Sequence, residues 1–499
     1  MKTGVLNYKY TIYLMVIFLT AFFILQGSYL PMIDLPQHMA QITELNNILH
    51  GNSKWNEFLV LNFNTPYLTC YLSLLLLTQF FEIVLASRIF VAICFLFFIY
   101  SVYKFNKISD GSYLVLWIAI PSFFGFAYYW GFISFLLAIP IGIIFFIENI
   151  KLARDLKLIN FICVIFLGVV LFYSHILSFL FFCLLSLVFI YFELRNKIDV
   201  FKVLPIYIFF SLLVVLYLSQ KDMLGVLYIQ DTRMHFESFT KHLKNLLVYP
   251  FDIGDKRFRY ISIMLILAPW FMGYGVSKNY KKFIPITVFL VVWFILPTGA
   301  HSTALVYERY ALLFFIFYYL IFEKKEDIKY IKSQLFFKLI FFICLSVLMI
   351  NNINNIIQFK KENQDFVEII ENVPSEKRAL GLIFDRNSNT LSLPRVYLHM
   401  PAWYQAQKNG WYDFSFAWFH PQIVRFNPKN APEVKPGFEW TPSDLLKLKN
   451  CMVYDLIIVR SDDKSALDII SNSKCSNQRL ILNKGSWYIF ESTSDESNK

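Results

Sequence analysis

Charged residues are scarce in this sequence. Asp, Glu, Lys and Arg make up 16% of the 499 residues, whereas hydrophobic residues make up 57% and aromatic residues 19%. Soluble globular domains contain about 25% charged residues, so this composition excludes an ordinary soluble protein. The sequence therefore predicts an integral membrane protein.

Long apolar runs are frequent instead. A helix needs about 20 residues to cross the ~30 Å hydrocarbon layer of a bilayer, and twelve runs reach or approach that length. They cover residues 10–30, 67–86, 88–103, 112–126, 132–147, 160–173, 177–192, 203–218, 260–276, 283–296, 304–322 and 335–350. Because the first run is long and lacks a small-residue cleavage site, we expect a permanent anchor rather than a removed signal peptide.

The composition changes after residue 350. Residues 351–499 are rich in Asn, Ser, Lys and Pro, and stretches typical of strands (ALGLIF, YDLIIV, WYIFES) alternate with stretches compatible with helices (PSDLLKLKN, DKSALDIIS). The sequence therefore predicts an all-α polytopic membrane domain over residues 1–350 and a small C-terminal α/β domain over residues 351–499.

Cysteine is also rare. Five of the seven cysteines lie in apolar runs, where we expect them to pack. Cys451 and Cys475 remain for the C-terminal domain. A disulfide between them would fit an oxidising compartment, and two reduced cysteines are an equally open alternative.

Lys and Arg concentrate in four loops between the apolar runs. These loops lie at residues 151–157, 195–202, 278–282 and 324–332. The positive-inside rule places them in the cytoplasm with the N-terminus. The first loop (31–66), a long loop (219–259) and the C-terminal domain then face outward. Orientation thus explains the formal charge of +11, and we expect no nucleic-acid partner.

The number of crossings follows from this orientation. Twelve full crossings would leave both ends of the chain on one side of the membrane. We therefore expect about eleven transmembrane helices, with the run at 67–86 re-entering the membrane or lying along its outer surface.

This topology brings scattered polar and aromatic residues to the outer face. They are Asp34, His38, Tyr128, Trp130, His175, His301, Glu308 and Arg309. Ionisable groups at a membrane boundary are costly to bury, so they are more often functional there than on a soluble surface. These eight residues form the candidate site.

Asp34 precedes a predicted helix that ends at Gly51. Asp34 fits an N-cap and Gln37 fits a capping box, and an apolar face predicts that the helix lies at the membrane interface. His38 lies one turn later on the same face, so both side chains can point to one place. Two ligands do not complete a metal site, and a hydrogen-bonding role for His38 is favoured.

The other six candidates each have a structural and a functional interpretation. Glu308 and Arg309 form a structural ion pair, or Arg309 binds a phosphate. Tyr128 and Trp130 belong to an aromatic belt, or they stack against a sugar. His175 and His301 fit a role in packing better than a role in catalysis.

One C-terminal segment, LPRVYLHMPAWYQAQKNGWYDFSFAWFHP, is unusually aromatic. Such residues form a domain core, or they line the entrance for a sugar acceptor, since aromatic faces bind the C–H surfaces of sugars. The candidates for an acceptor entrance are His399, Trp403, Tyr404 and Trp411.

Four features together resemble the GT-C glycosyltransferases, polytopic enzymes that take a sugar from a polyprenyl-phosphate donor at the outer membrane face. An acid follows the first crossing in IDLPQHMAQ, and Pro-Tyr opens the next run in TPYLTCYLSLLL. YYWGFISFLLAIP and YSHILSF look like segments of bacterial members, and an outer domain follows the crossings. The resemblance implies a bacterial cytoplasmic-membrane enzyme that transfers a hexose or pentose to a lipid, glycan or protein acceptor of the cell envelope.

Such enzymes use the first-loop acid as catalytic carboxylate, so the resemblance implies this role for Asp34 and a lipid-phosphate role for Arg309. A carboxylate whose pKa is raised by partial desolvation would take the proton of the attacking sugar hydroxyl, and a single displacement would invert the anomeric carbon.

Many members have a second acid in a later outer loop. The loop at residues 126–131 contains none, which leaves a divalent metal open. Glu308, Asp222 and Asp231 are the candidate substitutes.

Three other functions stay open. A polysaccharide polymerase or ligase would have a large outer loop rich in Arg and His, and residues 219–259 contain Arg233, His235, His242, Arg257 and Arg259. A lipid-linked sugar transporter or flippase is disfavoured, because the runs show no internal repeat and few charges at mid-membrane depth. A non-catalytic scaffold would tolerate replacement of Asp34 and Arg309.

Overall fold

The computed structural model describes residues 2–194, 196–220, 225, 233–300, 303–325, 332–463, 465–475 and 477–493. The chain forms two compact units. The first contains Met1–Gln26, Ile89–Ser219 and Gln230–Ile356, and the second contains Gly27–Arg88, Gln220–Ile229 and Ile357–Lys499.

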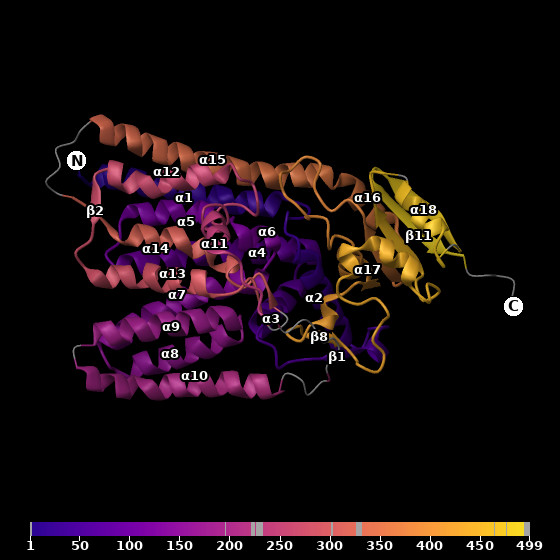
Figure 1. Ribbon diagram of the computed structural model, residues 1–499, viewed down its shortest axis with the longest axis horizontal. Coiled ribbons are helices and arrows are strands. Elements are labelled where there is room, and N and C mark those ends of the chain that lie inside the picture. The colour runs from indigo at the N-terminus through magenta and orange to yellow at the C-terminus, as the bar shows by residue number, and fades with distance from the viewer. Residues whose placement is uncertain are drawn as a thin grey trace. The chain divides into compact units, whose positions relative to one another are not determined.

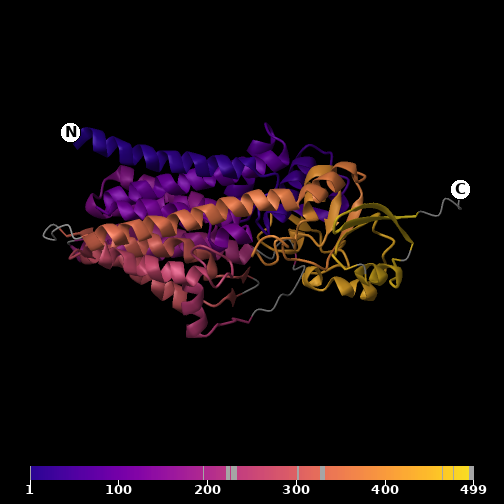
Figure 2. The ribbon, with the colours of Figure 1, turned by 90° about the horizontal axis from the view of Figure 1, so that it is seen from above.

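The first unit is a bundle of helices that run in roughly the same direction (Figures 1 and 2). Its helices are α1 (Lys2–Gln26), α4 (Ile83–Ile108), α5 (Tyr113–Ser122), α6 (Phe126–Trp130), α7 (Ile133–Arg154), α8 (Leu158–Phe172), α9 (Ile176–Glu193), α10 (Val200–Gln220), α11 (Phe239–Leu246), α12 (Phe258–Phe271), α13 (Ile284–Ile295), α14 (Phe314–Leu320) and α15 (Lys332–Glu362). Two short ribbons pair β2 (Tyr274–Val276) with β5 (Phe322–Lys324) and β3 (Gly299–Ala300) with β4 (Thr303–Ala304).

Among the described residues, six helices are long and apolar enough to cross a membrane. They cover Ile83–Ile108, Tyr113–Trp130, Ile133–Arg154, Ile176–Glu193, Lys197–Gln220 and Ser333–Glu362. Four shorter apolar helices cover Tyr10–Gln26, Leu68–Thr78, Leu158–Phe172 and Phe258–Phe271. The protein is therefore a polytopic helical membrane protein, and the count of about eleven crossings stays a prediction.

Two apolar runs are shorter as helices than the sequence suggests. The run at 304–322 is divided between β4, a 3₁₀-helix η4 (Glu308–Leu313) and α14. The run at 67–86 contains α3 (Leu68–Thr78), whose 11 residues span about 17 Å at 1.5 Å per residue. A helix of this length is too short for a full crossing.

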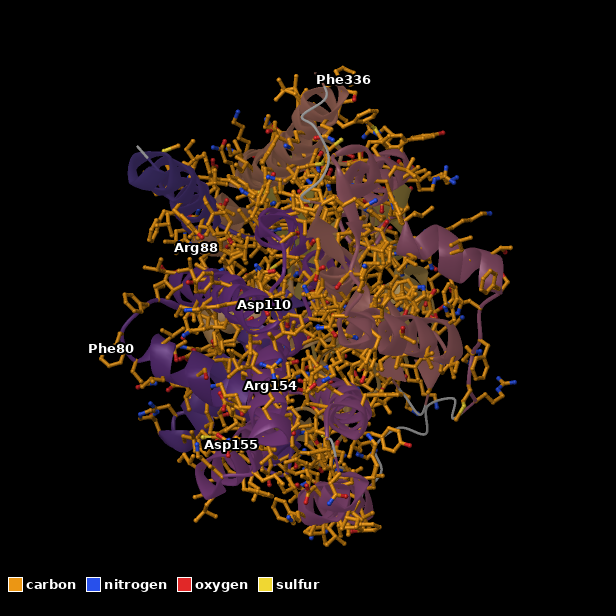
Figure 3. All side chains as sticks on the ribbon, turned by 90° about the vertical axis from the view of Figure 1, so that its left-hand side faces the viewer. Phe80, Arg88, Asp110, Arg154, Asp155 and Phe336 are labelled. Atoms are coloured by element: carbon orange, nitrogen blue, oxygen red, sulfur yellow. A yellow bond between two sulfur atoms is a disulfide. The ribbon has the colours of Figure 1, made fainter. Side chains whose placement is uncertain are left out.

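The outer helices of the first unit expose large apolar side chains. In α10, Phe201 and Leu212 are 69% and 55% exposed, and in α15 Phe336 is 58% exposed (Figure 3). In contrast, α7 is buried along most of its length. Exposed apolar surface on this scale is expected of helices that face lipid.

Charged residues of the first unit gather at helix ends. Arg154 ends α7, and its Nε lies 3.1 Å from the carboxylate of Glu193 at the end of α9. Asp110 and Arg154 also line a small cavity with Lys281 and Lys282 (Figure 3). Arg154, Lys281 and Lys282 lie in loops that the positive-inside rule predicts to be cytoplasmic, and Glu193 adjoins another of them.

The second unit is an α/β domain with a five-stranded sheet of order β10-β11-β9-β6-β7. The strands are β6 (Arg378–Ile383), β7 (Trp411–Asp413), β9 (Leu456–Arg460), β10 (Gln478–Lys484) and β11 (Trp487–Ser492). β6 runs parallel to β7 and β9, and β11 runs antiparallel to β9 and β10. The remaining helices are α16 (Gln364–Asn372), α17 (Ala402–Lys408), α18 (Ser465–Ser471), η1 (Asn56–Phe58), η5 (Phe416–Trp418), η6 (Phe438–Trp440) and η7 (Pro442–Lys447).

These elements confirm the α/β character predicted for the C-terminal part. ALGLIF, YDLIIV and WYIFES coincide with β6, β9 and β11, and DKSALDIIS contains α18. Cys451 and Cys475 form a disulfide, which decides between the two states that the sequence left open.

The second unit also includes residues from the N-terminal part of the chain. Here α2 (Leu35–Leu49) packs against α17 and α3, and β1 (Leu59–Leu61) pairs antiparallel with β8 (Val424–Phe426). The predicted division at residue 350 falls within α15, and the predicted first loop (31–66) clusters with the C-terminal part instead of the helical bundle.

The helix α2 is a core helix of its unit, and the expected interfacial helix is a wrong prediction. Ten of its first eleven residues, Leu35–Leu45, are buried, and Thr43 is the exception. The Gln37 amide donates to Phe414 O and accepts from Phe416 N, both at 3.0 Å. The polar side chains that resemble a solvent-facing stripe in the sequence therefore satisfy buried backbone groups.

Candidate functional site

A buried polar cluster lies at the start of α2. Oδ1 of Asp34 is 3.5 Å from Nε2 of His399, which precedes α17 in the chain. The Asp34 side chain is 10% exposed and the His399 side chain 6%. The structure thus brings together the predicted catalytic acid and one of the predicted acceptor residues.

His38 extends this cluster. Its Nδ1 is 3.2 Å from the hydroxyl of Tyr71, and that hydroxyl donates to Oε1 of Gln422. The ring of Phe416 packs edge-on against both histidines, with centroid distances of 5.7 Å to His38 and 5.3 Å to His399. His38 therefore has the hydrogen-bonding role that the sequence favoured.

The electrostatics of the cluster keep His399 neutral. Burial of the imidazole lowers the pKa of His399 from 6.5 to about 3, and the nearby His38 ring acts in the same direction. The Asp34 carboxylate, 3.5 Å away, favours the charged imidazolium, whereas burial of the ring opposes that charge. A neutral His399 with its proton on Nε2 would face the carboxylate, so Nδ1 would be an acceptor.

Asp34 has no capping role in this structure. It occupies the N-cap position of α2, but its side chain makes no capping hydrogen bond, and Gln37 bonds to the segment around Phe416. The proposed capping box is therefore wrong. The reason is that buried backbone groups of another segment compete for the Gln37 amide.

The three aromatic residues predicted at an acceptor entrance are core residues. Trp403, Tyr404 and Trp411 are at most 2% exposed. The hydroxyl of Tyr404 donates to Pro374 O at 2.9 Å, and the indole of Trp411 donates to Asp413 at 3.0 Å. The domain-core interpretation thus describes these three side chains, and His399 alone of the four reaches the Asp34 cluster.

Arg309 and His175 meet in the first unit. Nη1 of Arg309 is 3.2 Å from Nε2 of His175, and its guanidinium lies 3.8 Å from the ring centroid of Phe132. Nε and Nη2 donate to the carbonyls of Leu305 and Ala304, both at 2.9 Å. All three guanidinium nitrogens therefore have partners within the protein.

The predicted Glu308–Arg309 ion pair is not found among the described contacts. Glu308 is 2% exposed and accepts a hydrogen bond from Thr298 instead. Tyr128 is fully buried against Phe124, so it belongs to the core and not to an aromatic belt. Trp130 is partly exposed and stacks on Phe126 at 5.5 Å.

The predicted convergence of all eight candidates is not established. Asp34 and His38 belong to the second unit, whereas Tyr128, Trp130, His175, Glu308 and Arg309 belong to the first. His301 lies outside the described residues, as do Asp222 and Asp231.

No metal-binding cluster is found in the part of the chain that the structure describes. There, no three His, Cys, Asp or Glu side chains are grouped so that they could hold an ion. The Asp34 cluster offers one carboxylate and the imidazoles of His38 and His399. Both imidazoles pack against the Phe416 ring, and Nδ1 of His38 lies 3.2 Å from the Tyr71 hydroxyl. These described residues do not fit the divalent metal that the sequence left open.

The sequence did not identify two members of the Asp34 cluster. Tyr71 and Gln422 look like an ordinary helix residue and an ordinary loop residue, and only their hydrogen bond near His38 gives them a place in the site. The sequence signal that could have identified Tyr71 is the segment TPYLTCYLSLLL, which begins with Pro-Tyr and contains this residue.

Comparison of the chain with models of known protein families, with curated proteins and with solved structures found no match in any of the three. The function must therefore be argued from the site itself.

Proposed function

We propose that this protein is a membrane glycosyltransferase of the GT-C type. It moves a sugar from a polyprenyl-phosphate donor to a cell-envelope acceptor at the outer face of the membrane. The observation that supports it most is the pairing of the buried Asp34 carboxylate with the buried His399 ring, 3.5 Å apart.

The proposed reaction is a single displacement in which Asp34 is the general base. The carboxylate accepts the proton of an acceptor hydroxyl while that oxygen attacks the anomeric carbon of the donor. The new C–O bond forms as the bond to the phosphate breaks, and polyprenyl phosphate leaves with the bonding electron pair. The anomeric configuration inverts.

His399 is a positioning residue in this proposal. Its ring faces Oδ1 of the carboxylate through Nε2 at 3.5 Å and so limits the orientation of the Asp34 side chain. The aromatic edge of Phe416 fixes the ring plane. A neutral histidine also avoids lowering the basicity of Asp34, as a fixed positive charge would do.

The apolar helices and the disulfide agree with this assignment. A lipid-linked donor requires a membrane enzyme, and the six apolar helices meet that condition. A disulfide between Cys451 and Cys475 fits an oxidising compartment outside the cytoplasm. Arg309 is a less supported candidate for the leaving phosphate, because its nitrogens already have protein partners.

The polymerase or ligase alternative loses part of its support. His242, from the long outer loop, is 2% exposed, bonds to Trp293 O at 2.8 Å and stacks on Tyr307 at 4.1 Å. Arg257 is paired with Asp255, at 2.8 Å from Nε to Oδ2. These two residues have structural partners that account for them.

The test is sugar transfer by the purified protein in lipid vesicles. Polyprenyl-phosphate donors with different radiolabelled hexoses and pentoses are supplied with membrane glycolipid and glycan acceptors. Asp34→Asn is compared with the native chain, and Asp468→Asn, an exposed position of the same unit, is the matched control.

We expect transfer by the native chain and by Asp468→Asn, and none above background by a folded Asp34→Asn. Equal transfer by Asp34→Asn would remove the general base from the proposal. Absence of transfer from every donor would favour a transporter or a scaffold.

A further inference from the structure

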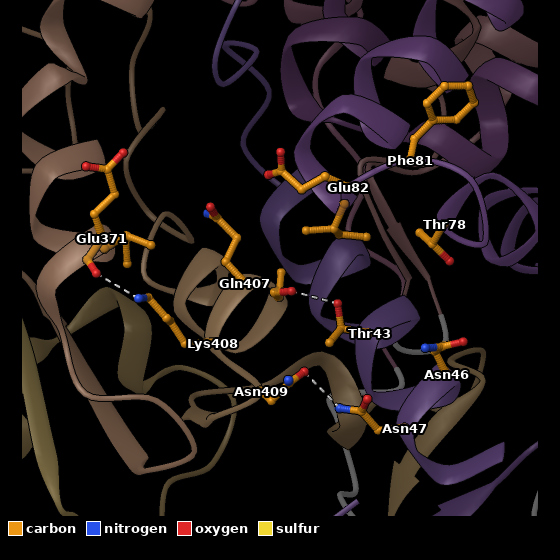
Figure 4. Close-up of a pocket in the computed structure, with 13 residues that line it drawn as sticks. Thr43, Asn46, Asn47, Thr78, Phe81, Glu82, Glu371, Gln407, Lys408 and Asn409 are labelled. Atoms are coloured by element: carbon orange, nitrogen blue, oxygen red, sulfur yellow. Dashed lines mark hydrogen bonds between the residues drawn. The ribbon is translucent and has the colours of Figure 1, made fainter. Parts of the chain in front are cut away.

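An open, polar cavity lies in the second unit, away from the Asp34 cluster. Its volume is about 630 Å³, and residues of α2, α17 and the loop after α3 line it (Figure 4). Four side-chain amides face it: Asn46 and Asn47 of α2, Gln407 of α17, and Asn409. We name this cavity the amide groove.

The amides of the groove are held in place but keep capacity for a ligand. Nδ2 of Asn47 donates to Oδ1 of Asn409 at 3.1 Å (Figure 4), and Nε2 of Gln407 donates to the Tyr29 hydroxyl at 2.8 Å. Each amide has two N–H donors and one carbonyl acceptor. Among the described contacts, the carbonyls of Asn47 and Gln407 and the N–H groups of Asn409 are not used by these bonds.

A second cavity adjoins the groove and adds an aromatic ring. It has a volume of about 380 Å³, shares Asn47 and Asn409 with the first, and is lined by Trp55. The Trp55 indole donates to Asn409 O at 3.4 Å and is partly exposed. An aromatic face beside hydrogen-bonding amides suits a sugar ring, which has apolar C–H faces and a polar edge.

The charges around both cavities nearly cancel. Glu82 and Glu371 line the groove with Lys408, whose Nζ donates to Glu371 O at 2.8 Å. In the adjoining cavity Lys54 pairs with Glu376. A cavity without excess positive charge is poorly suited to a phosphate or a nucleic acid, and it favours an uncharged ligand with many hydroxyls.

The helix α2 connects the groove to the proposed catalytic acid. Asp34 stands directly before α2, and Asn46 and Asn47 lie near its end. Twelve residues of helix separate Asp34 from Asn46, which corresponds to about 18 Å at 1.5 Å per residue. One sugar unit is too short for this distance, so a ligand that reaches both must be a chain of several sugars.

We propose that the amide groove binds the body of an uncharged oligosaccharide acceptor whose terminal hydroxyl reaches Asp34. This inference rests on the proposed glycosyltransferase function for the role of the ligand as acceptor. The binding of the oligosaccharide itself does not depend on catalysis. The glycan is either free or attached to a lipid.

The experiment measures binding to the purified full-length protein in lipid nanodiscs. The probes are neutral oligomers of glucose, mannose, galactose and N-acetylglucosamine of increasing length, each in a soluble form and in a lipid-linked form placed in the same nanodisc. The dissociation constant is measured by equilibrium titration, and contact is confirmed by saturation-transfer NMR for the soluble forms.

The groove variant combines Asn47→Ala with Asn409→Gly. Asn409 has a φ of 54°, a left-handed conformation that glycine adopts without strain, and alanine suits the exposed end of a helix. The control is Asn483→Ala, an exposed asparagine on β10. Thermal unfolding of all three proteins is measured beside the binding.

We expect at least one oligomer to bind the native chain and Asn483→Ala with equal affinity. We expect the groove variant to bind it at least tenfold more weakly, which corresponds to about 1.4 kcal/mol. Affinity should rise with oligomer length. Tighter binding in the lipid-linked form alone would identify a glycolipid as the source.

Two results would overturn the proposal. Either none of the oligomers binds the native chain in either form, or the groove variant binds as tightly as the native chain. Oligosaccharide binding without sugar transfer would support the groove as a binding site and contradict the proposed enzyme activity. Sugar transfer by the native chain, together with unchanged oligosaccharide affinity in the groove variant, would support the enzyme activity and contradict the groove.

Discussion

The two units each contain a buried cluster with a histidine and a charged partner, and the sign of the charge differs between the clusters: the partner is the Arg309 guanidinium in the first unit and the Asp34 carboxylate in the second. In the first unit, Arg309 is bonded to two backbone carbonyls and to His175. In the second, Asp34 faces His399, whose Nδ1 has no hydrogen-bond partner among the described residues. A guanidinium whose three nitrogens all bond within the protein is typical of a structural role, whereas a buried carboxylate beside an imidazole can act as a general base.

The largest expected effect is a loss of sugar transfer in Asp34→Asn that Glu308→Gln does not show. Loss of a general base lowers a rate by about 10²–10⁴-fold, and we expect this of Asp34→Asn in the transfer assay. Glu308→Gln should change the rate by less than about tenfold, because Glu308 accepts a hydrogen bond from Thr298 and takes no part in the proposed reaction. Equal losses in both variants would remove the distinction between the clusters.

The next effect concerns stability. Arg309→Met removes the hydrogen bonds to the carbonyls of half-buried Leu305 and exposed Ala304, and a hydrogen bond from a charged donor contributes about 1.5–3 kcal/mol. We therefore expect a loss of about 2–4 kcal/mol, seen as a lower midpoint of thermal unfolding in detergent. Arg309→Lys should recover part of the loss. An unchanged midpoint with a raised KM for the donor would instead make Arg309 a phosphate-binding residue.

A third prediction uses Glu44 of α2, which accepts a hydrogen bond from Ser53. Burial raises the pKa of Glu44 from 4.5 to about 7. The folded state therefore binds this proton more tightly than the unfolded state, and the stabilisation is lost as pH rises from 4.5 through 7. The loss should approach ~3 kcal/mol, at 1.36 kcal/mol per pH unit.

Glu44→Gln should remove this loss and unfold at a higher temperature than the native chain at pH 8. Thermal unfolding of both proteins across pH 4.5–8 provides the measurement. A native chain whose midpoint is independent of pH in this range would contradict the assignment.

The smallest expected effect concerns the neutral state of His399. Its pKa is lowered to about 3 from 6.5, so the unfolded state binds a proton below pH 6.5 that the folded state does not. Stability should fall by about 2 kcal/mol between pH 6.5 and 5. His399→Gln should flatten this slope, and an identical slope in the variant would show that His399 is charged in the folded protein.

Sequence reasoning predicted the elements that depend on local pattern. The apolar runs at 177–192 and 203–218 correspond to α9 and α10, and YDLIIV corresponds to β9. It failed where neighbours decide, as in α2, whose glutamines bond to buried backbone groups of a distant segment. It also failed for the run at 304–322, where apolar composition did not produce one long helix.

The sequence by itself determined that this is a polytopic helical protein with an α/β part, because length and hydrophobicity of single segments suffice for that. It also singled out Asp34, His38 and His399 as polar residues in unusual places. Only the tertiary structure decided that His399 faces Asp34. That contact depends on how α17 packs on α2, and such long-range packing is not encoded in the periodicity of either segment.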